Sequence, residues 1–307
     1  MTLHEILADL RSDRVKKVIL DCDAYNDIDD QYAIAFGVGS PKMNVLSVNA
    51  VLFNNYRCNG FEDGMKRSHD EIVKVLKFIG AENETKAYLG CPTPLSQMPE
   101  NTPVDSPAVQ NIIKTVHESD EIIYIIATGA ATNVASAIMT DPTIKDNLCV
   151  LWVGLNTFEG DGGPAGEFNY AQDEVAGRYL VDCGVNLVIL PAMGPEGLGT
   201  QTLIGNQEFL DGVVKGDSEV AKFFRNDLPE LAYPGETGWT HHFWDVAGPG
   251  LVHDASAFDL SIRMCPRIRG DGVWAFDTER HDVIYMSRLE PDKVMKDTFD
   301  AISKLIK

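Results

Sequence analysis

The stretch KKVILDCDAYNDIDDQYAIAF (residues 16–36) passes from an apolar, β-branched run through a group of aspartates into a second apolar segment. The first run predicts a buried strand, and a helix is expected to begin near Asp29. Five carboxylates lie within ten residues, at Asp21, Asp23, Asp27, Asp29 and Asp30. Their mutual repulsion must be offset, and a bound cation is the obvious source of opposite charge.

Apolar runs alternate with amphipathic stretches along most of the chain. The runs predict strands at 16–21, 44–52, 121–128, 148–154 and 185–191. The amphipathic stretches predict helices at 60–80, 106–119, 132–139 and 173–184. This alternation indicates an α/β fold with an open, mostly parallel, doubly wound sheet and helices on both faces.

The C-terminal part departs from the alternation. The segments GVWAFD (272–277) and HDVIYMS (281–287) predict a small C-terminal hairpin, and residues 291–307 predict a last amphipathic helix. No shift in composition marks a domain boundary, so we expect a single domain over residues 1–307.

The composition narrows the functional classes. With 46 Asp and Glu against 26 Lys and Arg, the formal net charge is −20, which repels a nucleic acid polymer. Six scattered cysteines without a C-x-x-C pair argue against a disulfide framework or a zinc site and for a reducing compartment. The N-terminal residues do not read as a signal peptide, and no apolar run approaches the roughly 20 residues of a membrane span. We therefore expect a cytoplasmic protein with no membrane partner.

Three segments are expected to converge at the carboxyl edge of the sheet, where open α/β folds bind ligands: the acidic cluster, ATGAATN (127–133) and PAMGP (191–195). Helix capping accounts for one or two aspartates but not for five. A calcium-binding EF-hand loop fails because Tyr25, Asn26 and Tyr32 stand where a ligand, a glycine and a glutamate are needed. A D-x-D phosphatase would use Asp21 and Asp23 but leaves the other aspartates unexplained. A site for a hard divalent cation is favoured.

Four segments, in order, resemble motifs of the nucleoside hydrolases, the inosine–uridine-preferring type and its relatives. DCDAYNDIDDQYAIAF (21–36) is similar to the D-x-D…D-D-x-x-A signature, and IIATGAATNVASAI (125–138) to the T-G-x-x-T-N-x-A motif. GEFNYAQDEVAG (166–177) resembles E-F-N-x-x-x-D-x-x-A, and FWDVAGPGLVHDASAF (243–258) resembles the aspartate-bearing helix start near the C-terminus. The resemblance implies a Rossmann-like nucleoside hydrolase fold and a Ca²⁺-dependent N-glycosidase that splits ribonucleosides into base and ribose.

The same resemblance implies a role for each site residue. The ligands of Ca²⁺ would be Asp23, Asp30, the backbone carbonyl of Thr128, and Asp245, and Asp23 would also take a proton from the attacking water. The ribose would be bound by Asp29, Asn54 or Asn55, Asn156, Glu167 and Asn169. Glu167 and Asn169, two apart on a segment expected to be extended, would point the same way. Carboxylates suit the reaction because cleavage of a ribosyl C–N bond builds an oxocarbenium-like cation.

The first departure from the family pattern is in the acidic loop. The family's commonest form is D-x-D-P-G-x-D-D, whereas this loop lacks the Pro-Gly and is two residues longer between Asp23 and the Asp29–Asp30 pair. Asp27 is thereby left without an assigned role, and a helix cap or a supporting aspartate is the simplest interpretation.

The second departure is near the C-terminal aspartate. Many members place a histidine immediately before it as general acid for the leaving base, but here Trp244 holds that position, with His241 and His242 just upstream. An indole stacks well on a purine, so these three are candidates for assisting departure of the base, although Trp244 could equally be a core residue. A competing alignment makes His253 and Asp254 the acid and the ligand. The spacing favours Asp245.

Together these observations predict a cytoplasmic, Ca²⁺-dependent hydrolase of ribonucleosides that prefers purines and serves purine salvage. Its partner would be a small nucleoside, and the resemblance implies a homodimer or homotetramer. Two alternatives stay open. The longer loop could reshape the pocket for another ribosyl compound, or the chain could be a metal-dependent ribose or nucleoside-binding protein without turnover.

Overall fold

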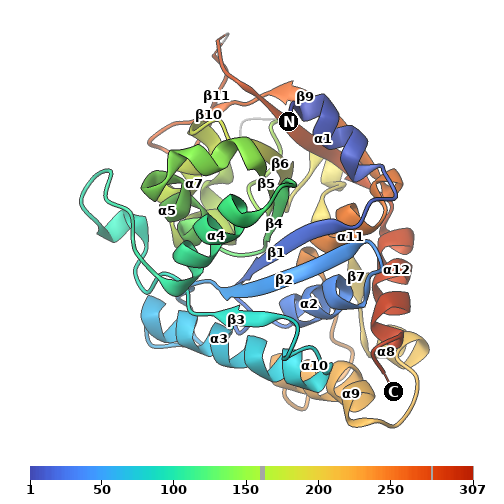
Figure 1. Ribbon diagram of the computed structural model, residues 1–307. Coiled ribbons are helices and arrows are strands. Elements are labelled where there is room, and N and C mark those ends of the chain that lie inside the picture. Colours follow the sequence, from blue (N-terminus) through green and yellow to red (C-terminus); the bar gives the residue numbers. More distant parts are fainter. Residues whose placement is uncertain (160–162, 278, 307) are drawn as a thin grey trace.

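The computed structural model describes residues 1–159, 163–277 and 279–306 (Figure 1). Its centre is an eight-stranded sheet in the order β3-β2-β1-β4-β5-β6-β12-β9, parallel throughout except for β9, which runs antiparallel to β12. The strands are β1 (Lys16–Cys22), β2 (Met43–Ala50), β3 (Lys86–Tyr88), β4 (Ile123–Ala127), β5 (Leu148–Val153), β6 (Asn186–Leu190), β9 (Phe258–Met264) and β12 (Asp282–Leu289). The predicted open, mostly parallel sheet is confirmed.

Helices cover both faces of this sheet. On one face pack α4 (Pro107–Glu118), α5 (Thr132–Thr140) and α7 (Glu174–Asp182). On the other face lie α2 (Asp29–Gly39), α3 (Phe61–Phe78), α11 (Ala247–His253) and α12 (Pro291–Ser303) (Figure 1). The shorter helices are α1 (Leu3–Leu10), α6 (Phe168–Gln172), α8 (Gln207–Val213), α9 (Glu219–Lys222) and α10 (Leu228–Ala232). None of the helices in the part of the chain that the structure describes is long and apolar enough to cross a membrane.

The small C-terminal hairpin exists, but its strands differ from those predicted. Strand β11 (Trp274–Ala275) pairs with β10 (Arg267–Ile268), and not with the segment 281–287. That segment forms most of β12, which enters the main sheet between β6 and β9. Residues 283–286 are all fully buried. A strand with both faces buried gains more from a central position than from a two-stranded hairpin at the surface.

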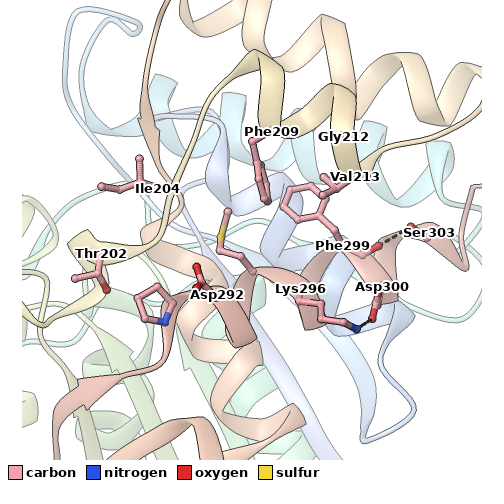
Figure 2. A pocket seen from close by; sticks show the side chains of 12 residues that line it. Thr202, Ile204, Phe209, Gly212, Val213, Asp292, Lys296, Phe299, Asp300 and Ser303 are labelled. Atoms are coloured by element: carbon pink, nitrogen blue, oxygen red, sulfur yellow. Dashed lines mark hydrogen bonds and ion pairs between the residues drawn. The ribbon is translucent and has the colours of Figure 1, made fainter.

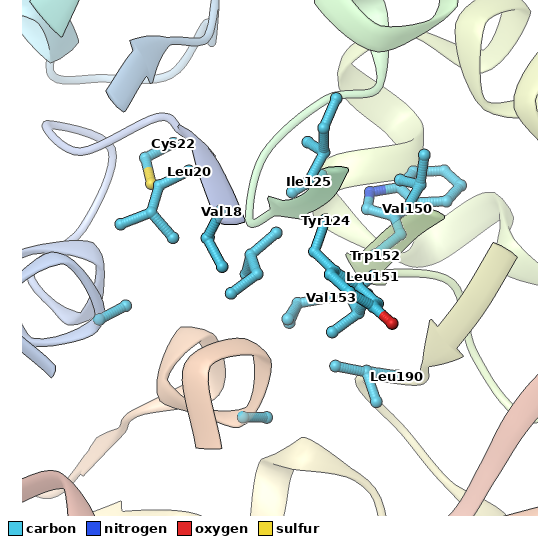
Figure 3. Close-up of a cluster of buried hydrophobic side chains, with 14 of the residues drawn as sticks. Val18, Leu20, Cys22, Tyr124, Ile125, Val150, Leu151, Trp152, Val153 and Leu190 are labelled. Atoms are coloured by element: carbon cyan, nitrogen blue, oxygen red, sulfur yellow. The ribbon is translucent and has the colours of Figure 1, made fainter. Parts of the chain in front are cut away.

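The central strands are apolar on both faces because helices cover both faces (Figure 3). Val18 and Leu20 of β1, Ile125 of β4, and Val150 and Trp152 of β5 are all buried in one continuous cluster. The Trp152 indole also donates a hydrogen bond of 3.1 Å to the carbonyl of Gly129, in the loop after β4. The core thereby supports a loop at the carboxyl edge of the sheet.

A second small sheet lies beside that edge. Its strands β7 (Ile204–Gly205) and β8 (His241–His242) pair antiparallel. Strand β8 leads directly into a short 3₁₀ turn, Trp244–Val246, and then into α11. The predicted aspartate-bearing helix start is therefore carried by a turn that packs against α2.

Candidate active site

A cavity of about 410 Å³ opens at the carboxyl edge of the sheet. Side chains and backbone from the ends of β1, β4 and β5, from α6 and from the turn before α11 line it. Eight of the residues predicted from the sequence are among those that line it: Asp23, Asp29, Thr128, Asn156, Glu167, Asn169, Trp244 and Asp245. The convergence expected from the positions of strand ends is therefore present in the fold.

Four carboxylates are gathered at this edge and are almost completely removed from water. Burial is the main reason why the pKa values of Asp23, Asp29 and Asp245 lie well above their usual range. Neighbouring carboxylates raise these pKa values further: Asp30 acts on Asp23, and Asp29 acts on Asp245. Burial raises the pKa of Asp30 to about 6. Without a cation, so many carboxylates could not all stay ionised at neutral pH.

Local structure holds this cluster in place. Asp29 and Asp30 are the first two residues of α2, where the helix dipole favours negative charge. The Thr128 hydroxyl donates a bond of 2.6 Å to Asp30 Oδ1, and the Asp245 backbone N–H donates one of 3.2 Å to Asp29 Oδ2. Asp23 Oδ2, by contrast, is buried with no hydrogen-bond partner within the described residues.

Gly129 allows the loop after β4 to approach Asp23. A β-carbon at residue 129 would lie 3.2 Å from the carboxyl carbon of Asp23 and 3.0 Å from the Val51 side chain. Any larger residue would push the loop, and with it Thr128, away from the aspartates. The glycine of the T-G pair is thus explained by a close approach of two strand ends.

Glu167 and Asn169 are not on an extended segment, so that prediction was wrong. Glu167 is the N-cap of α6, and its carboxylate accepts backbone N–H bonds of 2.8 Å from Asn169 and Tyr170 and of 2.9 Å from Leu155. Burial raises the pKa of Glu167 to about 7, and these three donors act against the rise. Both residues still line the cavity.

The amide of Asn169 links two strand ends. It donates bonds of 3.1 Å to the carbonyl of Thr128 and of 2.8 Å to the carbonyl of Val153. Asn156 also lines the cavity and accepts a 3.2 Å bond from the Met193 backbone N–H. Each amide therefore keeps one polar group unengaged by these contacts: the Oδ1 oxygen of Asn169 and the Nδ2 group of Asn156.

The structure does not place Asn54 and Asn55 among the residues that line the cavity. The backbone N–H of Asn54 donates to Gln172 Oε1 at 2.7 Å. The side chain of Asn55 donates to Asn26 Oδ1 at 2.7 Å, and Asn26 does line the cavity. Asn55 thus contacts the lengthened acidic loop and reaches the cavity only through Asn26.

At the aromatic part of the site, Trp244 lines the cavity and His242 stacks on it, with ring centroids 4.8 Å apart. His242 Nδ1 lies 2.7 Å from the carbonyl of Gln201. His241 is only 3% exposed, and burial lowers its pKa. Among the described residues, neither histidine belongs to the cavity lining.

The competing pair lies elsewhere in the structure. His253 is the last residue of α11, and its Nδ1 is 2.8 Å from the Ser40 hydroxyl. Asp254 caps the following 3₁₀ turn and forms an ion pair of 2.6 Å with Lys293. Both residues border a different surface hollow. They are therefore structural contacts in this chain, and Asp245 is the aspartate that meets the acidic cluster.

Comparison with known proteins identifies the family. The model of the family described as inosine-uridine preferring nucleoside hydrolase matches residues 18–242, from within β1 to the end of β8. The chain belongs to this family. The match covers the acidic loop, the T-G-x-x-T-N segment and the E-F-N segment, and it ends three residues before Asp245.

Individual relatives are distant. A pyrimidine-specific ribonucleoside hydrolase, RihA, of Salmonella arizonae is 27% identical over 185 residues, 56% of this chain and 58% of that protein. The match thus spans little more than half the length of this curated relative. A solved purine-preferring ribonucleoside hydrolase from Gardnerella vaginalis has a TM-score of 0.72 at 18% identity, covering 95% of this chain and 99% of that one.

A third similarity is to the type III effector protein XopQ, solved in complex with adenosine diphosphate ribose. Its TM-score is 0.69 at 13% identity, over 99% of this chain and 98% of that chain. At identities this low, the solved structures establish a shared fold and not a shared activity.

Several lining residues of this family member were not predicted. Phe168, 37% exposed, and Met193, 52% exposed, add apolar surface to the cavity, and Asn26 and Asp27 add polar groups from the longer loop. Phe168 stands between Glu167 and Asn169 in the E-F-N segment. Its position between two ribose-binding candidates could have predicted that it lines the cavity. Met193 belongs to the PAMGP segment expected at this edge, but its own role was not predicted; a bridge to Asn156 holds it there.

A groove of about 480 Å³ between α8 and α12 is separate from this site (Figure 2). Phe209 and Val213 of α8 face Phe299 of α12 there, and Lys296 pairs with Asp300 along its edge. None of the predicted site residues lines the groove.

Proposed function

We propose that this chain is a calcium-dependent N-glycosidase that hydrolyses ribonucleosides to free base and ribose. The observation that carries the proposal is the buried carboxylate cluster in a cavity that also presents an indole, a phenyl ring and a thioether. Carboxylates stabilise the positive charge that develops on the ribose, and aromatic surface accepts the flat base. The cavity thus offers each half of a nucleoside a matching surface.

The residues at the carboxyl edge fit Ca²⁺. Asp23, Asp30, Asp245 and the carbonyl oxygen of Thr128 offer only oxygen donors, which a hard cation prefers. Asp23 Oδ2 is buried without a partner among the described residues, and the raised pKa values of the aspartates express a repulsion that a dication would relieve. Bound there, calcium would supply the charge that orients vicinal hydroxyls and lowers the pKa of a water molecule.

The side chains of the chain supply the remaining functions. Asp23 is the base, because its unpartnered Oδ2 can accept the proton of the attacking water. Asp29 and Glu167 accept hydrogen bonds from ribose hydroxyls, Asn169 offers its free Oδ1, and Asn156 offers its free amide donor. Because the cap of α6 and the start of α2 hold these groups, the ribose meets a preformed set of partners.

The leaving base is assigned to the aromatic part of the cavity. Trp244 stacks on it, and the His242 ring, stacked on the indole with ring centroids 4.8 Å apart, restricts the rotation of Trp244. Stacking on an indole is stronger for the larger rings of purines, so we propose a purine preference and a role in purine salvage. Named relatives include both pyrimidine-specific and purine-preferring hydrolases, so the preference rests on Trp244 alone.

The test is release of free base and reducing sugar from inosine, adenosine, guanosine, uridine and cytidine, with Ca²⁺ and with chelator. Calcium-dependent release that is faster for the purines supports the proposal in full, and release that is faster for uridine overturns the preference only. Tight binding of a nucleoside without release would favour a ribose-binding protein. Neither release nor binding would indicate that the longer loop has reshaped the cavity for another ribosyl compound.

A further inference from the structure

The two-residue extension of the acidic loop brings Asp27 next to a histidine that lies more than two hundred residues away in the sequence. Asp27 Oδ1 lies 3.8 Å from His241 Nε2, the tip of a side chain on β8. One ligand atom from each of Asp27, Asp29 and His241 falls within 4.8 Å of the other two. Asp27 has no part in the proposed hydrolysis. Its Oδ1 accepts a 2.9 Å bond from the backbone N–H of Ile28, just before α2, and this local bond uses one of its two carboxylate oxygens.

The contacts of His241 are compatible with the tautomer that a metal ligand needs, with the hydrogen on Nδ1. Its Nδ1 is 2.9 Å from the Tyr233 hydroxyl, and that hydroxyl can donate its own hydrogen to the carbonyl of Thr240, at 3.3 Å. If Tyr233 donates to Thr240, its oxygen must accept from His241 Nδ1–H. The Nε2 nitrogen then carries a bare lone pair.

The Nε2 nitrogen faces carboxylate oxygens. His241 is 97% buried, and its Nε2 has no hydrogen-bond partner within the described chain. The nearest groups are the carboxylates of Asp27 and Asp29, which also present lone pairs. A positive charge between the two carboxylates and this nitrogen, either a proton on Nε2 or a metal ion, would satisfy all three groups.

We propose that Asp27, Asp29 and His241 form a second metal site, next to the calcium site, which takes a divalent transition-metal ion such as Zn²⁺ or Mn²⁺. One nitrogen and two carboxylate donors suit these ions better than Ca²⁺, which prefers oxygen ligands alone. Donors about 2.0–2.2 Å from one ion are at most about 4.4 Å apart, so the observed cluster needs only a small shift to close on a metal.

The surroundings support this assignment. Tyr233 holds the ring of His241 from the side opposite the carboxylates, as an outer partner of a metal-binding histidine does. Asp29 is held by the Asp245 backbone N–H, and the Asp27 side chain is 43% exposed. An ion can therefore enter from the cavity, to which Asp27 and Asp29 both contribute. The inference does not depend on hydrolytic activity.

The experiment is a titration of the full chain with Co²⁺, in an excess of Ca²⁺ that keeps the calcium site filled, read by the visible absorption of bound Co²⁺. We expect one Co²⁺ per chain. His241→Gln and Asp27→Asn should each weaken binding at least about tenfold, and Tyr233→Phe should weaken it by a similar factor through loss of the outer partner. His242→Gln is the matched control, because its Nδ1 bonds to Gln201 and it is not part of the cluster, so it should bind Co²⁺ normally.

The titration is repeated without Ca²⁺. Three outcomes would overturn the proposal: no Co²⁺ absorption in either titration, absorption that both Asp27→Asn and His241→Gln leave unchanged, or absorption that appears without Ca²⁺ and is absent in excess Ca²⁺. The first would mean that Asp27 and His241 share a proton as a simple ion pair. The last would mean that Co²⁺ had entered the calcium site. Asp27→Asn changes a partly exposed side chain, so it keeps the test valid even if His241→Gln does not fold. Base release measured in Ca²⁺ alone tests the proposed function independently.

Discussion

Replacing Asp30 by Asn should make the calcium-free protein more stable at high pH and no more stable at low pH. Burial raises the pKa of Asp30 from 3.8 to about 6, a rise of roughly two units. Each unit corresponds to about 1.4 kcal/mol, so ionising Asp30 costs the folded state about 3 kcal/mol. Because the pKa of Asp30 is higher in the folded than in the unfolded protein, wild type keeps its full free energy of unfolding below pH 4. It loses about 3 kcal/mol of that free energy as the pH rises through 6. Asn has the same shape without the charge and still accepts the Thr128 hydroxyl.

The measurement is the melting temperature of wild type and Asp30→Asn in chelator and in saturating Ca²⁺, at pH 4 and pH 8. For a chain of this size about 3 kcal/mol corresponds to about 6 °C, so in chelator the variant should melt about 6 °C higher at pH 8 and equally at pH 4. Ca²⁺ at 1,000 times its Kd stabilises wild type by about 4 kcal/mol. Because the variant lacks one Ca²⁺ ligand, Ca²⁺ should raise its melting temperature only slightly. In saturating Ca²⁺ at pH 8, wild type should therefore melt at the higher temperature.

A matched control is Asp254→Asn. Asp254 pairs with Lys293 outside the cavity, and its pKa is lowered to about 2 against the effect of burial, so loss of its charge should lower stability at pH 8 with or without Ca²⁺. If Asp30→Asn in chelator is less stable than wild type at pH 8, the argument that buried carboxylates repel one another in this site is refuted. If Ca²⁺ does not raise the melting temperature of wild type, the calcium assignment fails.

Four further substitutions test individual roles. Asp23→Ala and Asp245→Ala should each abolish base release while the circular dichroism spectrum stays unchanged, and near-normal turnover in either would contradict the metal-site assignment. Trp244→Ala should lower kcat/KM for inosine by roughly 5- to 100-fold, the worth of one stacked base, and an equal loss for uridine would dismiss the stacking role. Glu167→Gln removes a carboxylate oxygen that accepts backbone N–H bonds at the start of α6, so at pH 5, where Glu167 is uncharged in the folded protein, it should lower the free energy of unfolding by about 1–2 kcal/mol. Because burial raises the pKa of Glu167 to about 7, this loss should shrink at pH 8, and an equal loss at both pH values in urea denaturation would contradict the reasoning.

The sequence alone was sufficient for the features that depend on local patterns. Runs of buried apolar residues predicted β1, β2, β4, β5 and β6 to within a few residues, because a strand covered on both faces by helices must be apolar throughout. The acidic cluster was placed correctly at the end of β1, since the carboxyl ends of parallel strands share one edge of the sheet. The order of the four motifs was enough to identify the family.

Only the tertiary structure decided which strands are neighbours in the sheet and which distant side chains meet. Local periodicity shows that 281–287 is a strand but not that it inserts beside β6, because the choice depends on which neighbours bury it. Glu167 became a helix cap because the backbone turns there, which two residues at even spacing do not reveal. No local sequence pattern connects Asp27 with His241, although the two side chains lie close together in the structure. Their meeting depends on the path of the chain between β1 and β8, and contacts between such distant residues follow from packing and not from local pattern.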